Sequence, residues 1–97
     1  MSNQDFYITG SIDYIAPVET IETSNGSMKR RQFVVRGTDD KGYEVSAVLT
    51  VKNAKADTFD RDFAIGEKVT AWFNVRAFRS RDGRFFNDLT CWRVTNS

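Results

Sequence analysis

Arginines and aromatic residues are interleaved between residues 72 and 86. Four arginines fall within nine residues, from Arg76 to Arg84. A guanidinium group can bind a phosphate through two hydrogen bonds, and an aromatic ring can stack on an unpaired base. Together these side chains supply what a protein needs to hold single-stranded nucleic acid. The candidate nucleic-acid-binding residues of this segment are Trp72, Asn74, Arg76, Phe78, Arg79, Arg81, Arg84 and Phe86.

A second basic segment lies earlier in the chain. Residues 29–36 contain four bases and no acids, whereas residues 1–28 contain four acids and no bases. Residues 68–97 contain six bases and two acids, although the net charge of the chain is only +1. A fold that joins the two basic segments would create a local basic face, while the alternative is that both are solvated strand faces with counter-charges nearby. The candidates in the second segment are Lys29, Arg30, Arg31 and Arg36.

The sequence gives little support for catalysis. It contains no histidine, so the commonest general base and metal ligand is missing. Cys91 is the single cysteine and falls in a predicted strand, where a small core residue is expected. The acids of residues 39–40 and Asp82 fall in predicted turns, and Asp57, Asp60 and Asp62 are expected to form an exposed helix face. We therefore expect a protein that is not an enzyme, without a metal or other cofactor.

The arginine-rich segment is predicted to be a β-hairpin. Residues 68–78 and 85–94 alternate with period two on either side of an Asp-Gly turn. In the first strand, alternation assigns one face to the core: Val69, Ala71, Phe73, Val75 and Ala77. In the second strand both faces carry apolar groups, so alternation does not decide which one is buried. Trp92 is expected to pack at the end of a barrel, and Phe85 and Phe86 to divide into one core anchor and one stacking platform.

The remaining elements follow from apolar alternation and from turn residues. A first strand is expected from residue 6 to 15, ended by Pro17 and able to continue over 18–21. Residues 23–27 form a loop, 29–37 a second strand and 43–51 a third strand. In the second strand, Phe33 and Val35 should face the core. Residues 53–62 are the predicted helix, which Phe59 and Phe63 would dock on the core.

This order of elements predicts an OB-fold. The expected fold is all-β with one short helix, a five-stranded barrel in which the helix lies between strands three and four. Closing the barrel covers edges that an open five-stranded sheet would expose. At 97 residues the chain is expected to be a single OB-fold domain, residues 1–97. In such barrels the second and third strands and the flanking loops bind the ligand.

Several stretches resemble a family of short bacterial proteins classed as a domain of unknown function. The likeness rests on residues 73–76, 85–89 and 91–94, together with the basic strand 29–35 and the segment 65–69. It extends over roughly residues 8–94. That family resembles single-stranded DNA-binding proteins and shares their OB-fold. The resemblance implies a binding role, and a chain of this kind would fit a bacterium or a phage.

Two hypotheses of different class follow. The first is a sequence-tolerant single-stranded DNA-binding protein, with RNA as a variant, that forms a homo-oligomer such as a dimer or tetramer. The second is a protein-interaction or assembly module whose hairpin forms a subunit interface.

No apolar run approaches 18 residues, so we expect no membrane span. Residues 1–5 lack the features of a secretory signal and Cys91 is alone, which favours the cytoplasm.

Overall fold

The computed structural model describes residues 6–96, except for the side chain of Phe78. Residues 1–5, assessed above for a secretory signal, lie outside this range. The described elements are β1 (Phe6–Ile15), β2 (Glu19–Thr23), β3 (Gly26–Thr38), β4 (Glu44–Lys52), α1 (Ala54–Asp62), β5 (Lys68–Arg79) and β6 (Phe85–Asn96). Within residues 6–96 no helix is long and apolar enough to cross a membrane.

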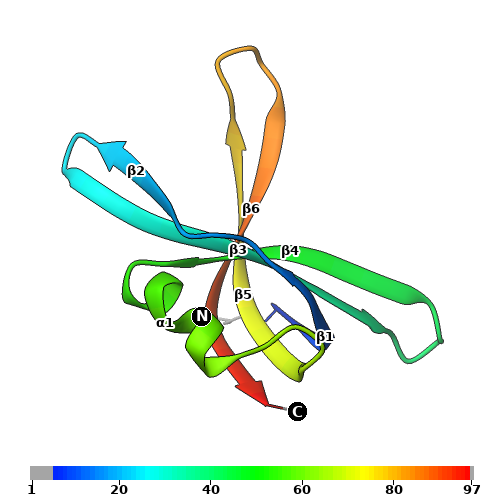
Figure 1. The fold of residues 1–97 in the computed structure, drawn as a ribbon. Helices are drawn as coiled ribbons and strands as arrows, with labels where there is room; N and C mark the ends of the chain where they lie inside the picture. Colours follow the sequence, from blue (N-terminus) through cyan, green and yellow to red (C-terminus); the bar gives the residue numbers. More distant parts are fainter. Residues whose placement is uncertain (1–5, 97) are drawn as a thin grey trace, which may run out of the picture.

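The strands form one closed sheet around the core (Figure 1). Their order is β1-β5-β6-β4-β3-β2, and an additional pairing of β1 with β3 closes the barrel. Pro17 divides the expected first strand into β1 and β2, so the six strands correspond to the five that the sequence predicts. Helix α1 connects β4 to β5, which is the predicted position between strands three and four. The OB-fold prediction is confirmed.

The first hairpin turn is tighter than the sequence predicts. Thr23 pairs with Gly26 across the turn, and β3 begins at Gly26 rather than at Lys29. The predicted loop over 23–27 is therefore wrong. Gly26 has φ +117, a conformation that side chains rarely adopt, and this lets the chain reverse within two residues. The basic residues that follow are thus part of a strand.

The core lies between the inner faces of the strands. Its largest fully buried side chains are Phe33, Ile12, Leu49, Val35, Val51 and Val69. Helix α1 adds Phe59, whose ring lies 4.3 Å from the ring of Phe33, centroid to centroid. Phe63 is half-buried, and its ring centroid lies 5.1 Å from that of Phe59. The predicted inward face of the second strand and the predicted docking of the helix are both confirmed.

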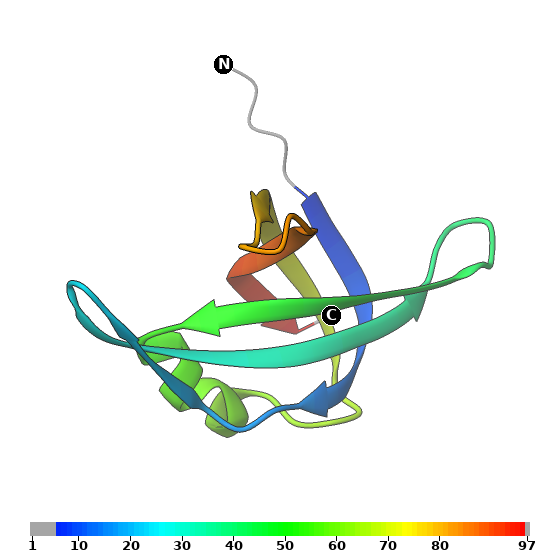
Figure 2. The same cartoon turned by 90° about the horizontal axis from the view of Figure 1, so that it is seen from above.

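Three hairpins project from the barrel as arms (Figures 1 and 2). They are formed by β2–β3, β3–β4 and β5–β6, whose longest strands have 13 and 12 residues. Beyond the barrel such strands expose both faces. Val75 is 47% exposed and Ala77 is also exposed, so the prediction that both belong to the core is wrong. Only the part of β5 nearest its start, including Val69 and Ala71, faces the core.

A bulge in β6 determines which of its residues are buried. Trp72 pairs with Arg93 and Phe73 pairs with Cys91, so Trp92 is an extra residue in β6. The extra residue reverses the alternation, and Cys91 is buried. Trp92 is 41% exposed, which corrects the expectation that it packs at the end of the barrel.

Barrel closure depends on a close approach of two backbones. Strand β1 pairs with β5 up to Ser11 and with β3 from Ser11 onward. At this crossing a methyl group on Gly10 would collide with the carbonyl oxygen of Arg36, and one on Gly37 with the carbonyl oxygen of Thr9. Both obstacles are backbone atoms, which cannot move without separating the strands. Only glycine therefore fits at these two positions.

We expect Gly10→Ala and Gly37→Ala each to destabilise the protein by about 1–3 kcal/mol or more, because the added carbon overpacks the crossing. Urea denaturation measures this change. Gly42→Ala is the control, since open space surrounds Gly42 and only its φ of +86 is strained. A loss at Gly10 or Gly37 no larger than that at Gly42 would contradict the closure argument.

Cys91 is expected to make stability depend on pH in the alkaline range. Burial raises the pKa of its thiol from 9.0 to about 11. The folded state therefore favours the protonated thiol, and this contribution is complete below pH 9.0 and is lost as the pH rises toward 11. Over that range the wild type should lose more stability than Cys91→Ala, as measured by denaturant unfolding at each pH. Parallel pH profiles of the two proteins would show that the thiol does not contribute.

Candidate nucleic-acid interface

The outer face of β3 and β4 presents small, apolar and charged groups. Val34 pairs with Val48, and Gln32 pairs with Thr50 in the same register. Val48 is 51% exposed although its neighbours in the chain are directed to the core. In OB-folds this two-stranded face, flanked by the first and last hairpins, is the usual ligand-binding surface.

Strand pairing connects this face to the β5–β6 arm, although Thr50 at the junction is only 4% exposed. Thr50 of β4 pairs with Thr90 of β6, and Thr90 pairs in turn with Asn74 of β5. Nearby, the Lys52 Nζ lies 3.8 Å from the Asp88 Oδ2, and the Thr90 hydroxyl donates to the same carboxylate oxygen at 3.0 Å. The Lys52 contact thus connects β4 to the base of the arm.

Three arginines of the arm have no acidic partner among the described residues. Arg76 lies opposite Asp88 in the strand register, but Asp88 forms its ion pair with Lys52. No carboxylate within residues 6–96 forms an ion pair with Arg76, Arg79 or Arg81. All three side chains are exposed. Their charges are therefore available to an anionic ligand.

The tip of the arm is an ordered turn. The Ser80 hydroxyl donates to the Asp82 carboxylate, and the Gly83 N–H donates to the Ser80 carbonyl at 3.1 Å. The Ser80 hydroxyl first, and then the Arg84 N–H, lower the pKa of Asp82 by donating hydrogen bonds to its carboxylate. Arg84 pairs with Asp82 at 3.3 Å, but both side chains are largely exposed. An exposed pair of this kind contributes about 0–1 kcal/mol, so a phosphate can compete for Arg84.

Two phenylalanines flank the turn on the β6 side. Phe85 is 74% exposed and Phe86 is 45% exposed, so neither is the core anchor expected from the sequence. The Arg79 guanidinium lies 5.7 Å from the centre of the Phe85 ring. Phe78 lies opposite Phe86 in the register, and its side chain lies outside the described part of the chain. Aromatic surface and positive charge therefore meet at this end of the arm.

Trp72 is on the outer face of β5, as predicted, but its ring is partly covered. The Arg93 guanidinium lies 4.9 Å from the ring centre, and the Tyr7 ring lies at 6.3 Å. The indole is half-buried, whereas Tyr7 is 63% exposed. A base that stacks on this part of the surface would thus meet Tyr7 or displace Arg93.

The basic segment at the start of β3 is paired with acids. Lys29 contacts Asp57 at 3.2 Å and Arg31 contacts Asp60 at 3.1 Å, which attaches α1 to β3. Asp57, Asp60 and Asp62 are exposed, as the sequence predicts, and the first two form these ion pairs with β3.

Arg31 is the unusual member of this segment. Its side chain is 10% exposed, and neither Nε nor Nη1 makes an aligned hydrogen bond. Arg30 pairs with Glu19 at 3.3 Å.

Arg36 lies between two carboxylates. Its guanidinium is 3.1 Å from Glu44 and 3.4 Å from Asp13. Glu44 first, and then Asp13, raise the pKa of Arg36. A phosphate would have to displace these acids. The structure thus brings the arm candidates, from Asn74 to Phe86, onto one hairpin and places the residue 29–36 candidates among counter-charges, although Arg30 and Arg36 share the outer face of β3 with Val34.

Sequence reasoning missed three polar residues where the outer face of β4 meets the arm: Lys52, Asp88 and Thr90. Alternation along β4 was the available signal for Lys52, because Ser46, Val48 and Lys52 share a face. For Asp88 and Thr90 the signal was alternation from Phe86, because the bulge at Trp92 changes the register only beyond Thr90.

Within residues 6–96 no cluster of three or more histidine, cysteine or acidic residues could hold a metal ion. A pocket lies away from the arm, between α1 and β6.

Solved structures similar to this chain are single-stranded DNA-binding proteins. Rim1, the mitochondrial single-stranded DNA-binding protein of S. cerevisiae, matches with TM-score 0.71 and 12% identity, over 99% of this chain and 95% of Rim1. The small single-stranded DNA-binding protein of Streptomyces coelicolor matches with TM-score 0.56 and 15% identity, over 100% and 94%. The corresponding domain of a Synechococcus protein matches with TM-score 0.63 and 11% identity, over 97% and 96%.

These identities support the fold alone. A search of curated protein sequences gave no significant match. The model of a protein family, Domain of unknown function (DUF3127), matches residues 7–95. This match confirms the resemblance found in the sequence, and the chain belongs to the DUF3127 family.

Proposed function

We propose that this protein binds single-stranded DNA without strong sequence preference, and that it is a binding protein rather than an enzyme. One observation carries the proposal: Arg76, Arg79 and Arg81 lack acidic partners and share an arm with exposed phenylalanine rings, beside the ligand-binding face of an OB-fold. Phosphates pair with such arginines while bases stack on the rings. The three similar solved structures described above, which are single-stranded DNA-binding proteins or domains, support the same interpretation.

The proposed path runs from the outer face of β3 and β4 along the arm. Asn74 and Arg76 lie where the arm leaves the barrel, and Arg79, Arg81 and Arg84 lie toward its tip. Phe78, Phe86 and Trp72 remain proposed stacking residues. Exposed Phe85 joins them from the opposite face of the hairpin, where it lies beside Arg79. RNA offers the same phosphates and bases, so it is a variant of this proposal.

The candidates in residues 29–36 are proposed to contribute less to DNA binding than the arginines of the arm. Lys29, Arg30 and Arg36 would contact phosphate only after their carboxylate partners are displaced. Arg31 is nearly buried against α1. We propose further that residues 1–97 form one domain, that the protein works in the cytoplasm of a bacterium or a phage-infected cell, and that it forms a dimer or tetramer.

An assembly module remains a second candidate function because of the apolar side of the arm. Val75 pairs with Leu89 there, and Val75 is 47% exposed. With Phe85 these residues form an apolar strip that a second subunit could cover. In that case the protein would form a stable oligomer that ignores oligonucleotides.

We expect the triple variant Arg76→Ala, Arg79→Ala, Arg81→Ala to lose most of its affinity for a labelled 30-nucleotide single-stranded DNA. Each lost phosphate contact should reduce the slope of log K against log salt by about 0.7, so the slope should fall by about 2. Fluorescence anisotropy over a range of salt concentrations measures both quantities. Duplex DNA should bind weakly to both proteins.

The matched control removes the same charge elsewhere. Lys41, Arg61 and Lys68 are exposed and have no acidic partner within the described residues. The triple variant Lys41→Ala, Arg61→Ala, Lys68→Ala should keep its affinity and salt slope. Equal losses in both variants would mean that net charge alone attracts DNA. No binding by the wild type would exclude the proposal and leave the assembly module, which analytical ultracentrifugation would then test.

Phe85→Ala should weaken binding in a different way. The ring is an exposed platform, and loss of one stacked base lowers the binding free energy by about 1–3 kcal/mol. The salt slope should stay unchanged, since no phosphate contact is removed. The same anisotropy titration gives both values, with Tyr43→Ala on the β3–β4 arm as control, because Tyr43 is 70% exposed. An unchanged affinity of the Phe85→Ala variant would show that the Phe85 ring does not contact the DNA.

A further inference from the structure

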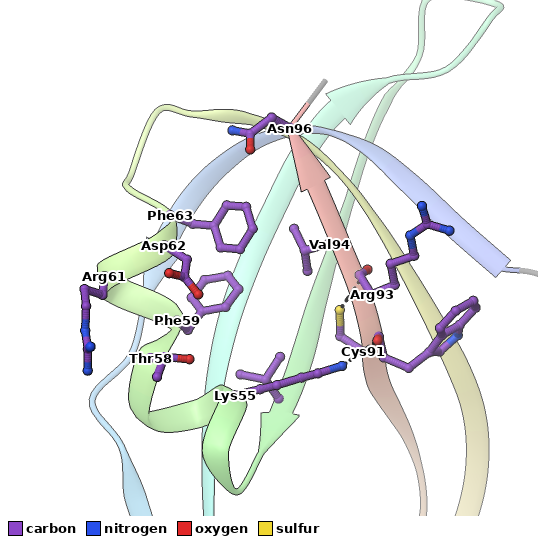
Figure 3. Close-up of a pocket in the computed structure, with 12 residues that line it drawn as sticks. Lys55, Thr58, Phe59, Arg61, Asp62, Phe63, Cys91, Arg93, Val94 and Asn96 are labelled. Carbon is purple, nitrogen blue, oxygen red and sulfur yellow. Dashed lines mark hydrogen bonds between the residues drawn. The ribbon is translucent and has the colours of Figure 1, made fainter.

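A pocket lies between α1 and the second half of β6, away from the arm (Figure 3). Its volume is about 620 Å³. The rings of Phe59 and Phe63 extend from the helix toward β6, where Val94 and Cys91 face them (Figure 3). Val51 of β4 completes the apolar lining. The pocket is large enough for a few side chains, within the roughly 300–1,000 Å³ of known ligand sites.

One wall of this pocket is an open strand edge. On one side β6 pairs with β5 as far as Asn96, but on the other it pairs with β4 only at Thr90. From Cys91 to Asn96 that second edge has no strand partner within residues 6–96. The Trp92 carbonyl oxygen accepts a hydrogen bond of 2.6 Å from the Lys55 Nζ instead. An open edge with unpaired backbone groups is a template for the addition of an extended segment.

The charged side chains around the pocket are mostly basic. Lys55, Arg61 and Arg93 line it, against one acid, Asp62. Lys55 spans the end of the pocket toward β6, and the Arg61 and Arg93 head groups point away from the pocket (Figure 3). The Arg93 guanidinium lies over the Trp72 ring, so Lys55 and Arg61 are the bases left to an incoming ligand. Arg61 is exposed and has no acidic partner within the described residues. The rim therefore favours an acidic ligand over a neutral or basic one.

We propose that this pocket binds an acidic, extended peptide segment of a partner protein. The segment adds to the open edge of β6 beside residues 92–96. Because side chains of a strand alternate, every second residue enters the pocket and contacts Phe59 and Phe63, while the residues between them meet the basic rim. Apolar side chains fill the first set of positions and carboxylates the second. The pocket is separate from the tip of the arm, so the protein could hold this partner and a nucleic acid together. Arg93 borders both sites, because it lines the pocket and covers Trp72.

The test uses the full chain and a fluorescein-labelled peptide of sequence Asp-Val-Glu-Phe-Asp-Val-Glu. We expect saturable binding by fluorescence anisotropy. A peptide with lysine in place of every acid, and one with serine in place of valine and phenylalanine, should both fail to bind. In hydrogen exchange, the amides of residues 92–96 should be protected by the first peptide, because strand addition pairs backbone groups.

Charge reversal at the rim separates this site from the proposed DNA surface. Arg61→Glu should weaken binding of the acidic peptide at least about fivefold, through loss of one attraction and gain of one repulsion. Lys41→Glu, the same charge change on the β3–β4 arm, should leave peptide binding unaltered. Arg61→Glu should also leave the affinity for single-stranded DNA unaltered, and a saturating oligonucleotide should not displace the peptide.

Several results would overturn the proposal. They are no saturable binding of the acidic peptide, equal binding of the lysine peptide, an unchanged affinity in Arg61→Glu, or displacement of the peptide by the oligonucleotide. Binding of the fatty acid laurate with no binding of the peptide would assign the pocket to a small amphipathic acid instead. Since none of these readouts requires DNA binding, the inference stands or falls independently of the proposed function.

Discussion

Strand β1 pairs with β5 through its first half and with β3 through its second half, and the change of partner takes place where Gly10 passes Gly37. This crossing closes the sheet. Closure brings the inner faces of β1, β3, β4 and β5 around one core, on which α1 docks through Phe59. A side chain on Gly10 or Gly37 would separate the two backbones. The core, the docking site of α1 and the direction of the arms therefore depend on the absence of a Cβ atom at both positions.

Only part of the length of each long strand belongs to the closed barrel, and the candidate ligand-binding surfaces lie on the parts that extend beyond it or along its outside. The β5–β6 arm leaves the barrel next to the outer face of β3 and β4, to which the contact of Lys52 with Asp88 connects it. Its arginines and phenylalanines need not serve the core because no core lies beneath them. Farther along β6, the brief pairing with β4 leaves an open edge beside α1. One strand thus takes part in two separate candidate sites.

Counter-charges distinguish the two basic segments of this chain. At the start of β3, Lys29 and Arg31 attach the helix through Asp57 and Asp60, and Arg36 is held between two acids. On the arm, Arg76, Arg79 and Arg81 have no such partners in the described residues. Positive charge in the sequence is therefore a poor guide to a phosphate site until the acids that neutralise it in space are known.

The sequence alone determined the strands, the helix and the OB-fold order, because alternation, turn residues and Pro17 act over a few neighbouring residues. It also placed the arginines and phenylalanines at a hairpin. Only the tertiary structure decided which residues are buried: Val75 and Ala77 follow the pattern of a core strand, yet they lie where β5 has left the barrel. The sequence also could not show which face of β6 is buried, because the bulge at Trp92 exists only through the pairing of β6 with β5. Contacts between distant segments set burial, register and charge pairing, and no local pattern contains them.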